Sequence, residues 1–233
     1  MFSNMTPVVK GIIILNVVFY VGTVFIAPGL YDTFALHFFE DPRFQIWQPI
    51  SHMFMHDSAN FLHILMNMYV LAIFGPPLER WMGNNKFIFF YLSSGIGAYL
   101  LTTGIDYYEY ITWTSEAIEA GATQAIVDQQ LFGTASNPNF WGVMVGASGC
   151  TFGVLAGFAF LYPNVKLQIL FIPFPIAAKW LIGAYFAYET IATLGITGVQ
   201  DNIGHAAHVG GAIVGFIITW YWKRNSMDKY RWD

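Results

Sequence analysis

The sequence predicts an all-α membrane protein built as a six-helix bundle, and composition and the recurrence of apolar runs carry this prediction. Hydrophobic residues make up 56% of the 233 residues and charged residues only 10%, whereas a soluble domain averages about 25% charged residues. Apolar runs long enough to cross the roughly 30 Å hydrocarbon core of a bilayer recur along the chain. In lipid such runs satisfy their backbone hydrogen bonds internally, so they are expected to be helices. We expect one membrane domain over residues 1–233.

Six runs have the length of a membrane helix. They cover residues 7–27, 61–81, 87–105, 143–162, 177–196 and 203–222. The first run lacks a small-residue cleavage pattern after a short apolar core, so we interpret it as a retained span. Of two long outer loops, residues 28–60 are rich in aromatic residues and methionine and are expected to dip into the lipid boundary. Residues 106–141 are expected to be exposed, with a short helix near 115–120 and no catalytic role.

Positive charges predict the orientation. One set of alternate ends carries nearly all of them: Lys10, Arg80, Lys86, Lys166, Lys179, Lys223, Arg224, Lys229 and Arg231. Only Arg43 lies on the opposite set, where most acidic residues fall. Because cytoplasmic loops are enriched in Lys and Arg, both termini are expected in the cytoplasm of a multi-pass protein of the cell (inner) membrane.

Several classes of function are disfavoured by composition and motifs. The net charge is only -4 and no basic run is present, so nucleic acid is not an expected partner. Cys150 is the single cysteine, which excludes an internal disulfide and a thiolate metal cage. The chain has no H-E-x-x-H string and no convincing internal symmetry, so a zinc protease and a transporter are disfavoured. We expect no metal and no cofactor.

The fourth run opens with a candidate nucleophile. Gly146-Ala147-Ser148-Gly149 places a hydroxyl at the outer end of this run, beside the free backbone amides of a helix N-terminus. Such amides can stabilise an oxyanion. A serine here can also simply cap the helix or allow close helix packing, and the string alone does not separate these interpretations.

The sixth run supplies a candidate base. His205 and His208 lie three residues apart and hence on one helical face, followed on the stripe of His208 by Gly211 and Gly215. The fourth run carries its own glycine stripe, Gly149, Gly153 and Gly157. Small-residue stripes let membrane helices approach backbone to backbone. Packing the two stripes together predicts that Ser148 and His208 lie at similar depth, where an imidazole can activate a hydroxyl.

The second run adds two candidate hydrogen-bond donors near its outer end. His63 and Asn67 lie four residues apart on one helical face. An imidazole and an amide can both donate to a developing oxyanion, and burial strengthens such bonds. A purely structural role, in which they bind loop backbone or each other, stays open.

Together these motifs resemble the signature of rhomboid intramembrane proteases. The resemblance rests on Gly146 to Gly149, on Ala207-His208-Val209-Gly210-Gly211 with Gly215, on His63 with Asn67, and on Gly75 with Glu79 and Arg80. It spans essentially all six runs in the right order. It implies Ser148 as nucleophile, His208 rather than His205 as base, and an oxyanion hole from His63, Asn67 and the backbone amide of Ser148, with Gly146, Phe152 and Gly211 in support.

The chain departs from the family pattern at two positions. Phe152 stands where members often have a tyrosine that packs against the base, a loss that matters little if stacking is its task. Gln48 follows Trp47 where many members have arginine, which puts a salt bridge in the first outer loop in doubt.

The remaining polar residues receive structural interpretations, with one exception. His52 and His56 are expected to bind loop backbone, and Glu79 with Arg80 to fasten a helix end. Glu189 lies within the fifth run, where a carboxylate needs a donor or a proton, and its partner is not evident from the sequence. With no acidic residue expected beside His208, a Ser-His dyad is favoured over a triad.

The predicted function is therefore an intramembrane serine endopeptidase acting on transmembrane protein substrates in the lipid bilayer. Its substrates should carry helix-weakening Gly or Pro near the cut, because a helical amide is shielded from attack. The alternative is a rhomboid-like protein that binds membrane helices without cutting them, although the intact Ser148 and His208 argue against it. The sequence leaves the oligomeric state open.

Overall fold

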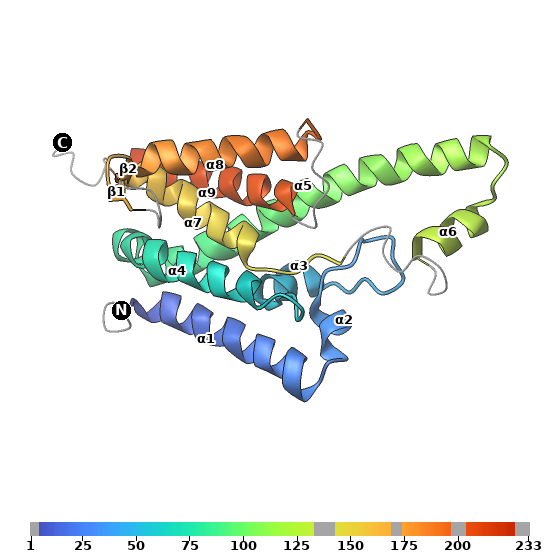
Figure 1. Cartoon of the computed structure of the whole chain (residues 1–233), viewed down its shortest axis with the longest axis horizontal. Coiled ribbons are helices and arrows are strands. Elements are labelled where there is room, and N and C mark those ends of the chain that lie inside the picture. The colour runs from blue at the N-terminus through green and yellow to red at the C-terminus, as the bar shows by residue number, and fades with distance from the viewer. Residues whose placement is uncertain (1–4, 133–142, 169–173, 197–203, 227–233) are drawn as a thin grey trace.

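The computed structural model describes residues 5–132, 143–168, 174–196 and 204–226, and this part of the chain is mostly helical (Figure 1). The longer helices are α1 (Pro7–Val21), α4 (Phe61–Met82), α5 (Asn84–Glu119), α7 (Ser148–Leu161), α8 (Ala178–Thr193) and α9 (His205–Ser226). The shorter ones are a π-helical turn (Gly22–Ile26), α2 (Leu30–Phe34), α3 (Gln48–Ser51), a 3-10 turn (His52–Phe54) and α6 (Gln124–Phe132).

Each of the six predicted runs contains a helix within the described residues, but the helices differ from the runs in length. Among the described residues three helices are long and apolar enough to cross a membrane: Pro7–Ile26, Phe61–Met82 and Asn84–Glu119. Helix α7 is apolar but has only 14 residues. The helical, membrane-type architecture is therefore confirmed, while the count of six membrane spans stays a prediction.

The second outer loop differs most from expectation. Helix α5 continues to Glu119 and projects beyond the rest of the bundle (Figure 1), whereas the sequence analysis ended this helix at residue 105. Residues 105–119 contain no proline or glycine to stop a helix, and it ends before Gly121, whose φ is 97°. Helix α6 then turns back, and Phe132 stacks on Phe38 of the first outer loop at a centroid distance of 6.4 Å.

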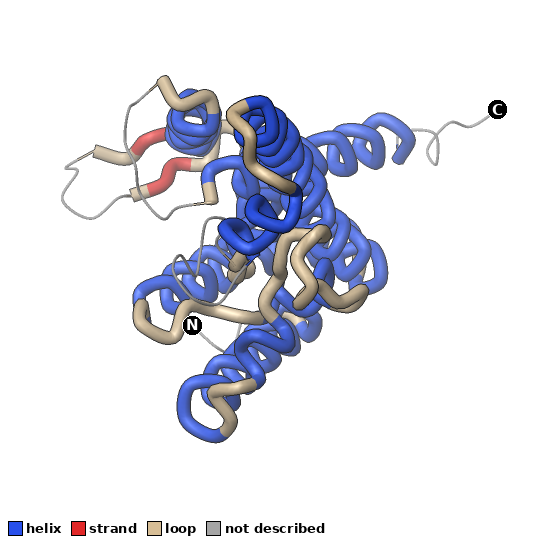
Figure 2. The backbone as a smooth tube through the Cα atoms, turned by 90° about the vertical axis from the view of Figure 1, so that its right-hand side faces the viewer, coloured by secondary structure: helices blue, strands red, loops and turns tan. Residues whose placement is uncertain are grey.

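The fold is also not purely helical. Between α7 and α8 the chain forms a two-stranded antiparallel sheet, in which Lys166 of β1 (Lys166–Leu167) pairs with Ala177 of β2 (Ile176–Ala177). Figure 2 shows the two strands at the edge of the bundle, and Leu167 of β1 packs against a cluster that includes Leu155 of α7 and Ile182 of α8. The described chain is mostly helical, as expected, with this small hairpin as an addition.

The glycine stripes pack together as the sequence predicts. A Cβ added to Gly211 of α9 would overlap the carbonyl oxygen of Gly149 of α7, and one added to Gly215 would lie 2.5 Å from the Cα of Gly153. Because a step of four residues on one helix matches a step of four in the same direction on the other, α7 and α9 run parallel. Their backbones are in direct contact, which side chains larger than hydrogen would prevent.

Helix α5 closes this core from a third side and runs antiparallel to α7. The side chains of Ala98 and Ser94 fill the space over Gly149 and Gly153, and the ring of Phe90 lies 3.2 Å from a Cβ position on Gly157. Residue numbers along α5 therefore decrease in the direction in which those along α7 increase. The resulting contacts fix the depth of α7 and α9 relative to each other.

The opposite end of the bundle is fastened by Glu79 on α4, as expected. Its side chain is 2% exposed and accepts hydrogen bonds from the backbone amides of Val8 at 3.0 Å and Val9 at 2.8 Å, and from the Thr6 hydroxyl. These are the free donors at the start of α1, so Glu79 caps that helix with a negative charge at its N-terminus.

Candidate active site

Ser148 is the first residue of α7, and an extended segment before it sets its position. The helix was predicted to begin at residue 143, but residues 143–147 are not helical. Met144 pairs with Leu36 in an antiparallel bridge, and the Gly146 amide donates to the His52 carbonyl at 3.0 Å. Gly146 has φ 131°, a left-handed value that stops a helix from starting earlier.

Gly146 also makes room for the site. A Cβ at this position would lie 2.8 Å from His63 Nε2 and 3.6 Å from Ser148 Oγ. The imidazole of His63 and the hydroxyl of Ser148 therefore lie on the same side of the Gly146 backbone. Both the positive φ and this close approach require glycine at position 146. Packing of α7 alone would not explain this first glycine of the GASG string.

His208 is held against the first turn of α7. Its ring stacks on Phe152 with centroids 4.1 Å apart and an interplanar angle of 5°, and its side chain is nearly buried, at 7% exposure. The preceding Ala207 presents its carbonyl oxygen 3.4 Å from a Cβ position on Gly149. The stacking expected of Phe152 is thus present without the family's tyrosine hydroxyl.

Asn67 lies beside the same turn through a residue that the sequence analysis missed. The Thr151 hydroxyl lies 3.1 Å from Asn67 Oδ1 and 2.9 Å from the carbonyl oxygen of Ser148. Asn67 Nδ2 donates to the carbonyl of His63 at 2.9 Å. An amide nitrogen carries two hydrogens, so one is left for a ligand among the described contacts. Thr151 could have been found from the sequence, because it is a polar residue in an apolar run and lies one turn after Ser148.

Glu189 on α8 has its partners here, which corrects the sequence analysis. Its side chain is 1% exposed, and Oε2 lies 2.6 Å from Nδ1 of His205 and 3.0 Å from Nδ1 of His208. The first contact has hydrogen-bond geometry, and the second is within ion-pair distance without an aligned N–H. The expectation that no acidic residue falls beside His208 was wrong, because α8 packs on α9 and brings residues 19 positions apart together.

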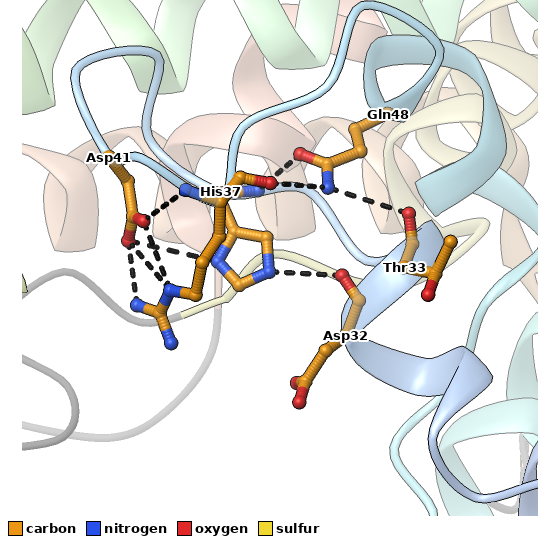
Figure 3. Close-up of polar contacts among 6 residues, drawn as sticks. Asp32, Thr33, His37, Asp41 and Gln48 are labelled. Atoms are coloured by element: carbon orange, nitrogen blue, oxygen red, sulfur yellow. Dashed lines mark hydrogen bonds and ion pairs between the residues drawn. The ribbon is translucent and has the colours of Figure 1, made fainter. Parts of the chain in front are cut away.

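The first outer loop supports the site from outside. Its central side chain is Gln48, which is fully buried, accepts from the His37 amide at 3.2 Å and donates to the carbonyl of Arg43 at 3.2 Å (Figure 3). Arg43 in turn binds Asp41 at 2.6 Å. Burial would raise the pKa of Asp41, but hydrogen bonds from Arg43 outweigh it and lower the pKa. Gln48 therefore ties the loop together with its amide, and a salt bridge forms elsewhere in the loop.

Two further histidines lie next to the site, in the segment that precedes α4. His52 Nδ1 lies 2.9 Å from the carbonyl of Gln48, and His56 meets His63 edge to face at a centroid distance of 5.1 Å. Burial lowers the pKa of His52 to about 4. Burial, followed by the nearby His63, lowers the pKa of His56 to about 3. Both rings are therefore neutral near pH 7. His52 binds loop backbone as expected, whereas among the described residues neither ring nitrogen of His56 has a partner with hydrogen-bond geometry, so a structural role for His56 stays a prediction.

One cluster has the spacing of a metal site. Glu189, His205 and His208 each offer a ligand atom, all within 4.8 Å of one another. The carboxylate contacts to the two imidazoles already pair these groups, so an ion is not required to explain the cluster. The expectation of no metal stays a prediction.

Comparison with known proteins agrees with these motifs. The Rhomboid domain family model matches residues 43–225. The chain is 30% identical over 182 residues to Rhomboid protein 1, mitochondrial, of Saccharomyces cerevisiae, covering 78% of this chain and 43% of that one. It is 29% identical over 177 residues to Rhomboid protease AarA of Providencia stuartii, covering 73% and 53%. It is 27% identical over 216 residues to the human Presenilin-associated rhomboid-like protein, mitochondrial, covering 91% and 47%.

This chain spans about half the length of these relatives. Two of the three are mitochondrial by name, so the comparisons support an integral membrane protein but not the expected cell inner membrane. The family model covers more than half of the chain, and its range includes Ser148, His208, His63 and Asn67. The chain belongs to the rhomboid family of membrane proteins.

Proposed function

We propose that this protein is an intramembrane serine endopeptidase, with Ser148 as nucleophile and His208 as general base. The observation that carries the proposal is the backbone contact between Gly149 and Gly211, which sets the first turn of α7 against the second turn of α9. The stack of Phe152 on His208 then holds the imidazole beside the turn that begins with Ser148. A hydroxyl beside an imidazole is the minimum that an activated serine requires.

In the proposed reaction, the Ser148 hydroxyl attacks the substrate carbonyl while its proton moves to Nε2 of His208. The resulting oxyanion accepts hydrogen bonds from the backbone amide of Ser148, His63 and Asn67. His208 returns the proton to the leaving amine, and an acyl-enzyme forms on Ser148. Water then attacks the acyl-enzyme, gives a proton to His208, and releases the second product as Ser148 regains its hydrogen.

The proposed substrates are transmembrane segments cut near their outer ends. A peptide bond in a helix is shielded by its own hydrogen bond and by side chains, so the segment has to unwind before Ser148 can reach it. Glycine or proline near the cut lowers the cost of unwinding. The rhomboid family and the apolar character of α4 and α5 support this substrate class.

The proposed topology has six spans and both termini on the cytoplasmic side. It rests on the charge asymmetry, although Lys229 and Arg231 lie outside the described residues. Single cysteines in a Cys150→Ser background, treated with an impermeant thiol reagent on intact cells, test it. Labelling of Ala122→Cys without labelling of Asn225→Cys is expected, and the reverse pattern would overturn the orientation.

The activity is tested with purified protein in liposomes that contain a single-span substrate with a Gly-rich outer end. Wild type should release a fragment that begins inside or near the span, and Ser148→Ala should release none. Equal cleavage by both would remove Ser148 from the mechanism. Substrate binding without cleavage by wild type would favour the alternative, a rhomboid-like protein that binds membrane helices.

A further inference from the structure

Glu189 contributes a carboxylate to the site, and the proposed mechanism of Ser148 and His208 assigns it no role. It is 1% exposed, and burying a charge at such a position is costly unless its partners repay the cost. We propose that Glu189 is a positioning residue that holds His208 in the orientation and tautomer needed to accept the Ser148 proton, and that His205 fixes the carboxylate in turn. This inference rests on the proposed function.

The two contacts of His208 fix different degrees of freedom of its ring. Stacking on Phe152 at 4.1 Å and 5° sets the plane of the ring. Stacking does not distinguish the ring from the same ring flipped by half a turn, which would exchange the places of its nitrogens and carbons. The contact of Nδ1 with Glu189 Oε2 at 3.0 Å selects one of the two. Plane and rotation are then both determined.

The same contact selects the tautomer. A neutral imidazole carries one proton on either nitrogen, and a carboxylate oxygen beside Nδ1 favours the proton there. Nε2 is then left as the acceptor, which is the form a general base needs. When His208 takes the Ser148 proton, the imidazolium forms 3.0 Å from a negative charge. Pairing of opposite charges in a low-dielectric site stabilises that state.

His205 explains why the carboxylate stays in place. Its Nδ1 and Glu189 Oε2 are hydrogen-bonded at 2.6 Å, so one oxygen serves both histidines. The edge of the His205 ring meets Tyr188 on α8 at a centroid distance of 5.9 Å. The hydroxyl of Tyr185, one turn before Glu189, interacts with the same carboxylate. From α4, His63 lies close enough to His208 for the two rings to interact electrostatically. The carboxylate is thus anchored on α8 and by His205 independently of its contact with His208.

The matched variants are Glu189→Gln, which keeps the shape and removes the charge, and Glu189→Asp, which keeps the charge on a shorter arm. Glu189→Gln should lower kcat on the order of 10²-fold or more with KM nearly unchanged, a smaller loss than the roughly 10⁴-fold seen when a triad acid is neutralised. Glu189→Asp should recover part of that loss. His205→Ala should lower kcat by about 10-fold, because the carboxylate keeps its charge but loses an anchor.

The control is Glu79→Gln, which neutralises the other glutamate that is nearly fully buried and at hydrogen-bonding distance from several partners. It should lower the melting temperature and leave kcat unchanged. The decisive readout is therefore kcat against KM, measured on preparations whose melting temperatures are known.

The outcomes separate this inference from the proposed function. If wild type cleaves, Ser148→Ala does not, and Glu189→Gln keeps the wild-type kcat, Glu189 has only a structural role. If Glu189→Gln does not fold, the other two variants decide. A wild-type kcat in both Glu189→Asp and His205→Ala would likewise show that Glu189 has only a structural role. Loss of wild-type activity on chelation, with recovery on adding Zn²⁺, would show that the cluster holds a metal and would overturn the inference. Failure of wild type to cleave would count against the proposed function itself.

Discussion

The two buried glutamates of this bundle are alike in burial and differ in their partners. Glu79, at 2% exposure, accepts from backbone amides at 3.0 and 2.8 Å. Glu189, at 1% exposure, contacts two imidazole nitrogens at 2.6 and 3.0 Å. A backbone amide does not act as a general acid or base, so the first carboxylate is expected only to fasten a helix. An imidazole can gain and lose a proton, so the second can influence chemistry. The partner, rather than the burial, indicates the role.

The comparison extends to the two ends of the bundle. At the Glu79 end, polar side chains join the start of α1 to the end of α4. At the other end, polar side chains from α4, α7, α8 and α9 converge on the first turn of α7. Substitutions at the first end should therefore change stability, and substitutions at the second should change turnover at nearly constant stability.

The largest expected effect separates the two histidines that share Glu189. His208→Ala should reduce cleavage by about 10⁴-fold or more, because the nucleophile loses its base. His205→Ala should keep measurable turnover, since in the proposed mechanism His205 acts on the base only through Glu189. Initial rates on one substrate measure both. A normal rate in His208→Ala together with an inactive His205→Ala would mean that His205 is the base.

The next effect concerns Asn67, whose role can be either catalytic, as proposed for the Glu189 end of the bundle, or structural, as for Glu79. As an oxyanion donor, Asn67→Ala should lower kcat by about 10²-fold or more with little change in KM, because the negative charge exists only in the transition state. Thr151→Val should act in the same direction but less, since the Thr151 hydroxyl contacts Asn67 Oδ1. Kinetics and melting temperature are measured on the same preparation. A destabilised variant with normal turnover would place Asn67 with Glu79 as a structural residue.

A packing variant tests whether the helix contact underlies the site. Gly211→Ala should destabilise the protein by about 1 to 3 kcal/mol and reduce activity, because the new methyl overlaps the Gly149 carbonyl. Gly183 on α8 has no atom within 4 Å of its Cβ position. Gly183→Ala should therefore be neutral or stabilise by up to about 1 kcal/mol. Unfolding in detergent measures both, and equal stability of the two variants would contradict the close contact.

The smallest effect is a pH dependence of stability. Burial lowers the pKa of His52 to about 4 and that of His56 to about 3, below the value of about 6.5 in an unfolded chain. The unfolded state then binds protons that the folded state does not, so stability falls as the pH drops below about 6.5. From pH 7 to 6 the loss is about 0.7 kcal/mol per histidine. His56→Phe should reduce this dependence, and an unchanged pH profile would contradict the burial of a neutral ring.

The sequence was sufficient to predict the contacts that rest on short-range periodicity. Stripes of glycine four residues apart predicted the contact of α7 with α9. Ser148 was expected near the outer end of the fourth run, but that run was predicted to begin at residue 143, whereas α7 begins at Ser148. The stack of Phe152 on His208 was expected from the resemblance to the family, in which a tyrosine often packs against the base at this position. Only the glycine contact was predicted from helix geometry and side-chain size alone.

The contacts that depend on the rotation of one helix against another were not predictable in this way. Tyrosines and apolar residues lie on several sides of α8, so its pattern does not indicate that Glu189 faces α9. The length of α5 was missed for a different reason. Acidic residues such as Asp106 and Glu109 indicated water, but a helix can continue into water when no breaker residue stops it.

The most direct measurement of the central claim is the mass of the covalent adduct formed by a fluorophosphonate, a reagent that reacts with activated serines. After incubation of the folded protein in detergent, digestion and mass spectrometry locate the modified residue. We predict one adduct, on Ser148, with no labelling of Ser148→Ala and a strongly reduced rate of labelling in His208→Ala. Labelling that persists in Ser148→Ala, or labelling of Ser148 at an equal rate in His208→Ala, would contradict the pairing of Ser148 with His208.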